Sequence, residues 1–213
     1  MIRVYKSPNA PLSLSTTARY DNEDVVRQLQ SDHLKKCYLC ERRLVADFQI
    51  EHHRSEKHYP LLRQHWDNLY WVCNYCNGKK LHHNDNLLHP TSVNIEEEIE
   101  HIVDFVNKRF LFKTIIASDS HIQTIDFLSK VHNGAGKIRK LREEEFCEKI
   151  LEITNEFYRL VSRYLSDPSI TNEELVRESL QIDKECLGFK YWIIKKHPQL
   201  SITFAKDIVW NKQ

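Results

Sequence analysis

Four of the six cysteines are spaced for metal binding. Cys37 and Cys40 form one Cys-x-x-Cys pair, and Cys73 and Cys76 form a second. Each pair lets two thiolates from one tight turn reach a single ion, and two pairs complete the tetrahedron that Zn²⁺ prefers. Such a site is closed, so we expect one structural Zn²⁺ per chain. The remaining two, Cys147 and Cys186, stand alone among apolar residues, and we expect them to be buried.

The segment between and just after the pairs carries residue types that suit phosphodiester hydrolysis. This reaction needs a base that deprotonates water and a divalent cation that neutralises charge on the phosphate. A neutral histidine is a suitable base, and carboxylate and amide oxygens suit Mg²⁺ or Mn²⁺. The candidate residues are Glu51, His52, His53, Asn68, Asn77, Lys79 and Lys80.

Residues 37–80 resemble the HNH (ββα-metal) endonucleases, in which two zinc knuckles flank a β-hairpin and a helix. The resemblance implies that His52 is the general base and that Glu51 and Asn77 bind the catalytic Mg²⁺ or Mn²⁺. It also implies that Asn68 orients the base or shapes the hairpin, and that Lys80 meets phosphate. A rival register remains, with His52 as a metal ligand and His53 as the base.

A longer pattern narrows the resemblance. The chain carries, in order, the motifs EH-x-R-x-x-K, YP-x-L, WDNL and C-x-x-C-N-x-x-K. With these motifs it resembles the PtuB family, the HNH subunits of Septu-type and retron-associated anti-phage systems. The similarity implies a PtuA-like ATPase partner and a nucleic-acid substrate, with DNA favoured and RNA as an alternative. The chain departs from the pattern at Ser55, where a proline is expected.

Charge places a limit on the expected affinity for nucleic acid. The net charge is +1, and residues 31–90 hold nine Lys and Arg against seven Asp and Glu. Basic side chains near the candidate base still offer contacts to phosphate, and we expect Arg54, Lys57 and Lys79 to make them. We therefore expect weak binding by the isolated chain and delivery to its target by a partner.

The chain divides into three parts on composition and periodicity. We expect an N-terminal arm with a helix (residues 1–30), a zinc-stapled ββα-metal module (31–90) and a helical body with a possible partner-docking surface (91–213). The expected fold class is therefore α+β, mainly α. The expected strands are 44–50, 69–72 and, less regularly, 110–116. Helical spacing and capping residues predict helices at 22–30, 95–110, 121–132, 137–165 and from 171, followed by a short tail.

Two other functions fit parts of this pattern. An autonomous restriction-type HNH nuclease would need a DNA-reading module, and neither a further zinc finger nor a basic helix is evident. A non-catalytic zinc-stapled adaptor for nucleic acid or protein would not need Glu51, His52 and Asn77 together. No apolar run approaches the roughly 20 residues of a membrane helix, so we expect no membrane partner and a cytoplasmic location.

Overall fold

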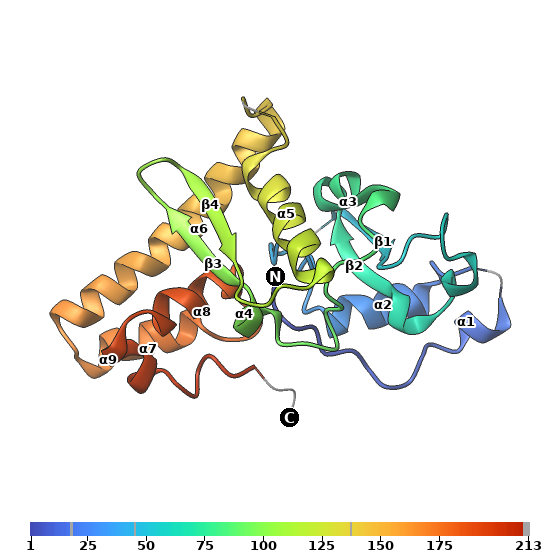
Figure 1. Cartoon of the computed structure of the whole chain (residues 1–213). Helices are drawn as coiled ribbons and strands as arrows, with labels where there is room; N and C mark the ends of the chain where they lie inside the picture. The colour runs from blue at the N-terminus through green and yellow to red at the C-terminus, as the bar shows by residue number, and fades with distance from the viewer. Residues whose placement is uncertain (18, 45, 137, 211–213) are drawn as a thin grey trace.

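The computed structural model describes residues 1–17, 19–44, 46–136 and 138–210. It is a mixed α and β structure with two small antiparallel sheets (Figure 1). The strands are β1 (Phe48–His52), β2 (Leu69–Cys73), β3 (Glu100–Asp104) and β4 (Arg109–Lys113). The α-helices are α1 (Ser13–Thr16), α2 (Glu23–Asp32), α3 (Asn74–Lys80), α4 (Ile95–Glu98), α5 (Asp119–Asn133), α6 (Leu141–Ser166), α7 (Ile170–Ser179), α8 (Leu187–Lys195) and α9 (Pro198–Thr203).

The first hairpin and the helix after it occupy the region between the cysteine pairs. β1 pairs antiparallel with β2, with Glu51 opposite Tyr70 and His52 opposite Leu69. α3 follows β2 directly and packs on both strands. Every residue of β2 is buried, and Phe48 stacks on Trp71 with ring centroids 3.8 Å apart. The expected hairpin is therefore present, followed by a helix.

The second hairpin replaces most of the helix expected at 95–110, and that prediction is wrong. Only the short helix α4 forms there, and β3 and β4 follow. The apolar residues of this stretch fit the two-residue repeat of a β-strand as well as the 3.6-residue repeat of a helix. His101 faces Phe112 across the hairpin, and both are buried, whereas the neighbouring pair Ile102–Leu111 is less buried. Burial of alternate residues against α5 and α8 decides between the two periods.

After the second hairpin, the helical body follows the predicted order until its C-terminal part. α5 and α6 correspond to the predicted helices 121–132 and 137–165, and α7 corresponds to the one expected from Thr171. The residues taken as a short tail instead form α8 and α9. α8 is almost wholly buried, with Phe189 at 2% and Ile194 at 0% exposure, so tertiary burial stabilises a helix whose first turn contains Gly188.

The main hydrophobic cluster crosses all three parts of the chain. It contains Met1, the four paired cysteines, residues of β2 and β4, and Phe189 of α8. Glu41 connects distant segments: its carboxylate pairs with the α-amino group of Met1 at 2.6 Å and accepts the backbone N–H of Gly188 at 3.1 Å. A second cluster lies between α6, α7, α8 and α9. Figure 1 shows these four helices on one side of the molecule and the first hairpin on the other.

In the described part of the chain, no helix combines the length and apolar character that crossing a membrane requires. Cys147 and Cys186 are buried, as the sequence predicts.

His132 lies at the centre of the body and links stability to pH. Its ring is 1% exposed and packs against Phe110, Phe146 and Phe189. Its Nδ1–H donates to the Leu128 carbonyl at 2.9 Å. Burial lowers the pKa of His132 from 6.5 to about 3, so the folded protein keeps this ring neutral in mild acid.

We predict that His132→Phe weakens the acid sensitivity of the fold. Below pH 6.5 His132 binds a proton in the unfolded chain but stays neutral in the folded chain. The free energy of unfolding therefore falls as pH falls toward 3. One such group accounts for about 1.4 kcal/mol per pH unit. Urea unfolding should therefore show that the variant loses about 2 kcal/mol less than the wild type between pH 6.5 and pH 5. Equal losses would contradict the buried neutral ring.

Candidate metal centre and hydrolytic site

The four paired cysteines meet in one buried cluster. One sulfur from each lies within 4.8 Å of the other three, and all four residues are at most 2% exposed. The Cys40 and Cys73 sulfurs are 3.9 Å apart. A tetrahedral zinc with Zn–S distances of about 2.3 Å requires sulfurs about 3.8 Å apart. The donor set and its size therefore fit a structural zinc ion.

Local backbone structure holds each pair. In the first, a turn closes when the Cys37 N–H donates to the Arg42 carbonyl and the Glu41 N–H donates to the Cys37 carbonyl. Glu41 takes a φ of 60°, a left-handed conformation that the turn requires. In the second, Cys73 is the N-cap of α3, and its sulfur accepts the Cys76 N–H at 3.4 Å. A metal here would join the first turn to the junction of β2 and α3.

Charge explains why these sulfurs need a cation. Burial raises the pKa of Cys40 and Cys76 well above the usual range, whereas hydrogen bonds from Cys37 and its neighbours lower that of Cys73. Four thiolates could share this volume only around a positive ion. Arg42 lies beside them: burial lowers the pKa of its guanidinium, but the charges of Cys40 and Cys73 outweigh burial and raise it. Arg42 thus stabilises the negative charge of the cluster.

A polar layer lies between β1 and α3. Gln49 and Glu51 share one face of β1, and from α3 the Asn77 amide donates to the Gln49 side-chain oxygen. This contact leaves the Asn77 oxygen as an acceptor. Glu51 and Asn77 could therefore supply two oxygens to one cation, and water and phosphate would complete the shell that Mg²⁺ prefers. Gln49 was not among the residues predicted for the site. Its position two residues before Glu51, near the end of the predicted strand, places both side chains on one face and could have identified it.

The sequence predicts that Lys80 contacts phosphate, but the structure buries its side chain. Its side chain is 0% exposed, and Nζ lies 2.7 Å from a Glu51 oxygen and 2.9 Å from the His52 carbonyl. Burial raises the pKa of Glu51, and the charge of Lys80 offsets part of that rise. Lys80 therefore acts in this structure as an internal partner that orients Glu51 and favours its ionised form.

His52 ends β1 and is held by the main chain. Its Nε2 lies 2.9 Å from the Arg63 carbonyl, and its ring meets Tyr20 edge-on at 4.6 Å. A carbonyl only accepts, so Nε2 carries the proton and Nδ1 is left with its lone pair. Burial lowers the pKa of His52, which favours the neutral ring. An imidazole in this state can accept a proton from water.

Asn68 fixes the loop that contacts His52. Its amide donates to the carbonyls of Arg54 and Leu62 at 3.0 and 3.1 Å, and its oxygen accepts the Arg54 N–H at 2.7 Å. Leu62 directly precedes Arg63, whose carbonyl holds His52. Asn68 thereby fixes the loop whose Arg63 carbonyl holds the His52 ring.

His53 occupies the interior. It is 2% exposed, packs against the rings of Tyr70 and His89, and its Nδ1 is buried without a hydrogen bond. Burial lowers its pKa to about 3. A substrate could not reach this ring without rearrangement, which argues against the register in which His53 is the base.

The three residues predicted to contact nucleic acid differ in availability. Arg54 lies against Tyr59 and donates to its hydroxyl at 3.1 Å, and Lys57 lies 3.0 Å from a His82 nitrogen; both contacts are at the surface. Lys79 instead pairs with Glu143 of α6 and is 22% exposed. Lys79 connects the hairpin region to the helical body, and only Arg54 and Lys57 remain open to phosphate.

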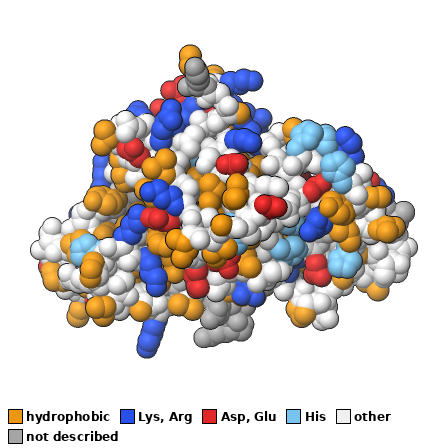
Figure 2. Space-filling view, viewed as in Figure 1, with side chains coloured by type: hydrophobic (Ala, Val, Ile, Leu, Met, Phe, Trp, Pro, Cys, Tyr) orange, Lys and Arg blue, Asp and Glu red, His pale blue; other side chains and the backbone are white. Residues whose placement is uncertain are grey.

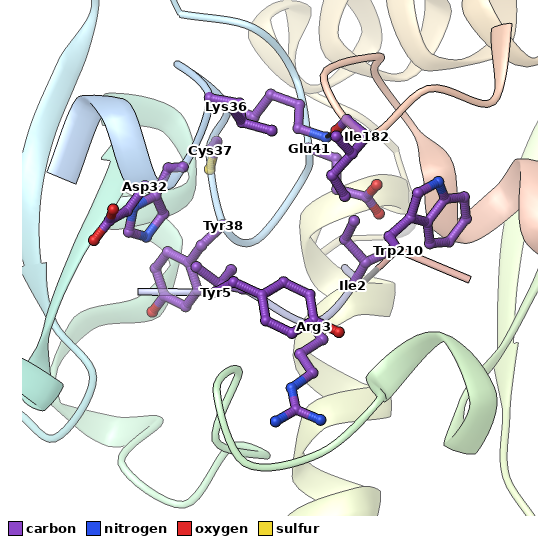
Figure 3. A pocket seen from close by; sticks show the side chains of 13 residues that line it. Ile2, Arg3, Tyr5, Asp32, Lys36, Cys37, Tyr38, Glu41, Ile182 and Trp210 are labelled. Atoms are coloured by element: carbon purple, nitrogen blue, oxygen red, sulfur yellow. Dashed lines mark hydrogen bonds between the residues drawn. The ribbon is translucent and has the colours of Figure 1, made fainter. Parts of the chain in front are cut away.

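A cavity of about 380 Å³ lies away from this layer, where the N-terminal segment, the first cysteine turn and the C-terminal residues meet (Figure 3). Its three buried charged side chains serve the fold: Lys36 donates to the Ile182 and Lys184 carbonyls, Glu41 binds the α-amino group, and Asp32 accepts the Ser7 N–H. Because these groups are already used within the fold, the β1–α3 layer remains the candidate site.

Comparison with known proteins adds no identification. No protein-family model matches the chain, and neither a curated protein nor a solved structure matches it. Within the described residues, the four cysteines are the only group of three or more His, Cys, Asp or Glu side chains close enough to hold a metal.

We predict that zinc content depends on the clustered cysteines alone. Cys76→Ser should lose the metal and lower the midpoint of thermal unfolding, since the cluster joins the first cysteine turn to the junction of β2 and α3. Cys147→Ser is the matched control, because Cys147 is equally buried but lies outside the cluster. Metal analysis and thermal unfolding measure both; equal zinc loss in the two variants would contradict the assignment.

We predict that Asn68→Ala destabilises the protein by roughly 2–3 kcal/mol. The change leaves one N–H and two carbonyls of the loop without their partner, and each such buried group costs about 1–3 kcal/mol unless water replaces it. Urea unfolding of zinc-loaded protein measures the loss. An unchanged midpoint would show that the loop does not depend on this amide.

Proposed function

We propose that the chain is a metal-dependent endonuclease of the HNH type that hydrolyses phosphodiester bonds. One observation carries the proposal. A hairpin and the helix after it, which a four-cysteine cluster connects to the first cysteine turn, bring the side chains of Glu51 and Asn77 to one polar layer. The next residue of β1, His52, holds its ring on the Arg63 carbonyl through Nε2 and leaves Nδ1 open. The resemblance of residues 37–80 to HNH enzymes supports the same conclusion.

The chemistry follows from these groups. Nδ1 of His52 accepts a proton from the attacking water, while the Arg63 carbonyl keeps the ring oriented. Glu51 and Asn77 would hold Mg²⁺ or Mn²⁺, which supplies positive charge to the phosphate and the leaving oxygen. Lys80 keeps Glu51 oriented from inside, and Asn68 keeps the loop in place. His52 and Glu51 are thus both supported by buried partners, which preorganises the site.

We further propose that the enzyme works as the nuclease subunit of an anti-phage complex with a PtuA-like ATPase. The sequence resemblance to PtuB supports this role. So does the small surplus of positive charge in residues 31–90, because weak intrinsic binding suits an enzyme that a partner delivers. DNA is the favoured substrate and RNA the alternative.

We predict that His52→Ala abolishes cleavage while zinc and fold persist. Removal of a positioned general base costs roughly 10²–10⁴-fold in rate. Plasmid DNA and total RNA are incubated with the protein in Mg²⁺ or Mn²⁺, with and without the ATPase. His65→Ala, which changes an exposed histidine of the same module, is the control and should keep full activity.

The outcomes separate the alternatives. Full activity in His52→Ala would overturn the assignment of the base. Metal-dependent cleavage without the ATPase would favour an autonomous nuclease. Absence of cleavage under every condition would favour a zinc-stapled adaptor.

A further inference from the structure

A shallow depression lined by histidines lies at the surface of the same region. The loop after β1 and the segment after α3 form its wall, and its volume is about 480 Å³. Figure 2 shows histidine side chains gathered on this side of the molecule. The residues that line it include His58, Tyr59, His82, His83, Asp85 and Asn86. None of them belongs to the layer formed by Gln49, Glu51, Asn77 and Lys80.

One of these histidines is oriented by a carboxylate. Nδ1 of His58 lies 2.7 Å from an Asp85 oxygen, and Asp85 is only 12% exposed. Because an ionised carboxylate only accepts, Nδ1 carries the proton and Nε2 points outward. His58 is 47% exposed, and no group in the described part of the chain hydrogen-bonds its Nε2. A histidine fixed by a carboxylate, with its second nitrogen open, has the geometry of an acid–base group.

Ser55 anchors this pair. Its N–H donates to one Asp85 oxygen at 2.7 Å and its hydroxyl to the other at 2.8 Å. A proline, which the HNH-type pattern expects in this segment, has no N–H and no hydroxyl and could make neither contact. The residue that departs from the pattern, Ser55, is thus the one that holds Asp85, and Asp85 in turn orients His58.

The other two histidines of the depression lack this arrangement. His82 shares its Nε2 with the Lys57 ammonium at 3.0 Å, so that nitrogen is an acceptor in use. His83 packs against His82 in a tilted arrangement, with ring centroids 3.9 Å apart, and has no carboxylate partner among the described residues. His58 is therefore the one imidazole in the depression that is both oriented by a carboxylate and open at Nε2.

The depression lies close to the proposed hydrolytic site. Ser55 is three residues beyond His52, so their Cα atoms are at most about 11 Å apart. The loop then turns back, since the N–H groups of His58 and Tyr59 both donate to the Ser55 carbonyl. Besides burial, the charge of Asp85 contributes to the raised pKa of Glu51, so the two carboxylates are within electrostatic range.

We propose that His58 is a second acid–base residue, which donates its Nε2 proton to the leaving oxygen when the phosphodiester is cleaved; this inference rests on the proposed nuclease function. Water loses a proton to His52 and forms the new P–O bond. The bond from phosphorus to the leaving oxygen breaks, and its electron pair takes up the proton of His58. The imidazolium of His58 becomes neutral, His52 becomes charged, and solvent returns both to their starting states.

A pair of substrates tests this step directly. One is an ordinary oligonucleotide, and in the other sulfur replaces the bridging leaving oxygen at a single position, because a thiolate leaves without protonation. With Mg²⁺ or Mn²⁺ and zinc-loaded protein, His58→Ala should slow cleavage of the oxygen substrate by roughly 10²–10⁴-fold. It should slow the sulfur substrate by less than about tenfold. His58→Gln, which keeps a hydrogen-bond donor but cannot give up a proton, should match His58→Ala.

His83→Ala is the matched control and should cut both substrates at the wild-type rate, since it removes a neighbouring imidazole with no carboxylate partner. Introduced into the wild-type protein, Asp85→Asn should also slow the oxygen substrate more than the sulfur substrate. Introduced into His58→Ala, it should slow neither substrate further. Equal slowing of both substrates, an unaltered rate, or rescue by His58→Gln would each overturn the proposal. If the wild type cleaves and His52→Ala does not, a failed result for His58 overturns only the role of His58. If the wild type cleaves neither substrate, the proposed nuclease function fails as well.

Discussion

The structure depends first on bringing four buried sulfur atoms to one point. The strands β1 and β2 have five residues each, and a two-stranded hairpin of this size is marginally stable in water. A zinc ion at the sulfurs would tie the first cysteine turn to the junction of β2 and α3, at the end of the hairpin opposite His52. The Tyr38 N–H strengthens the same connection by donating to the Trp71 carbonyl at 3.0 Å. The distance between Glu51 on the strand and Asn77 on the helix is therefore set by the cluster rather than by local propensity.

A buried ion pair then prepares the proposed metal ligand. Removing Lys80 and Glu51 from water costs more than their attraction returns in many proteins, so such a pair is weak evidence for stability. Its value here is chemical, because burial favours the protonated form of Glu51 and the ammonium counters that effect. Since Lys80 holds one carboxylate oxygen, the other remains for a cation. The cost of burying two charges is consistent with a site in which an ionised, oriented oxygen matters more than stability.

Sequence pattern predicts the elements whose signals are local. The cysteine spacing predicts the clustered sulfurs, capping and periodicity predict α5, α6 and α7, and the β-prone runs predict the hairpin. The helix expected at 95–110 is wrong because its apolar residues fit two periods, and only contact with α5 and α8 selects the strands. α8 escapes prediction for the same reason, since its stability comes from burial rather than propensity. Lys80 shows the corresponding limit for the site: its residue type suits phosphate, but its burial follows from the packing of α3 on β1.

The two proposed acid–base histidines differ in the partner that orients each ring, and this difference was beyond sequence reasoning. His52 donates its Nε2 proton to a main-chain carbonyl, which leaves Nδ1 as an acceptor. His58 donates its Nδ1 proton to the carboxylate of Asp85, which leaves Nε2 open to solvent. The proposed base thus has a neutral partner, and the proposed acid has a negatively charged one. Asp85 lies 27 residues from His58 along the chain, and Ser55 is the only local sign of their pairing. Ser55, where the HNH resemblance leads to the expectation of a proline, supplies two donors to that carboxylate.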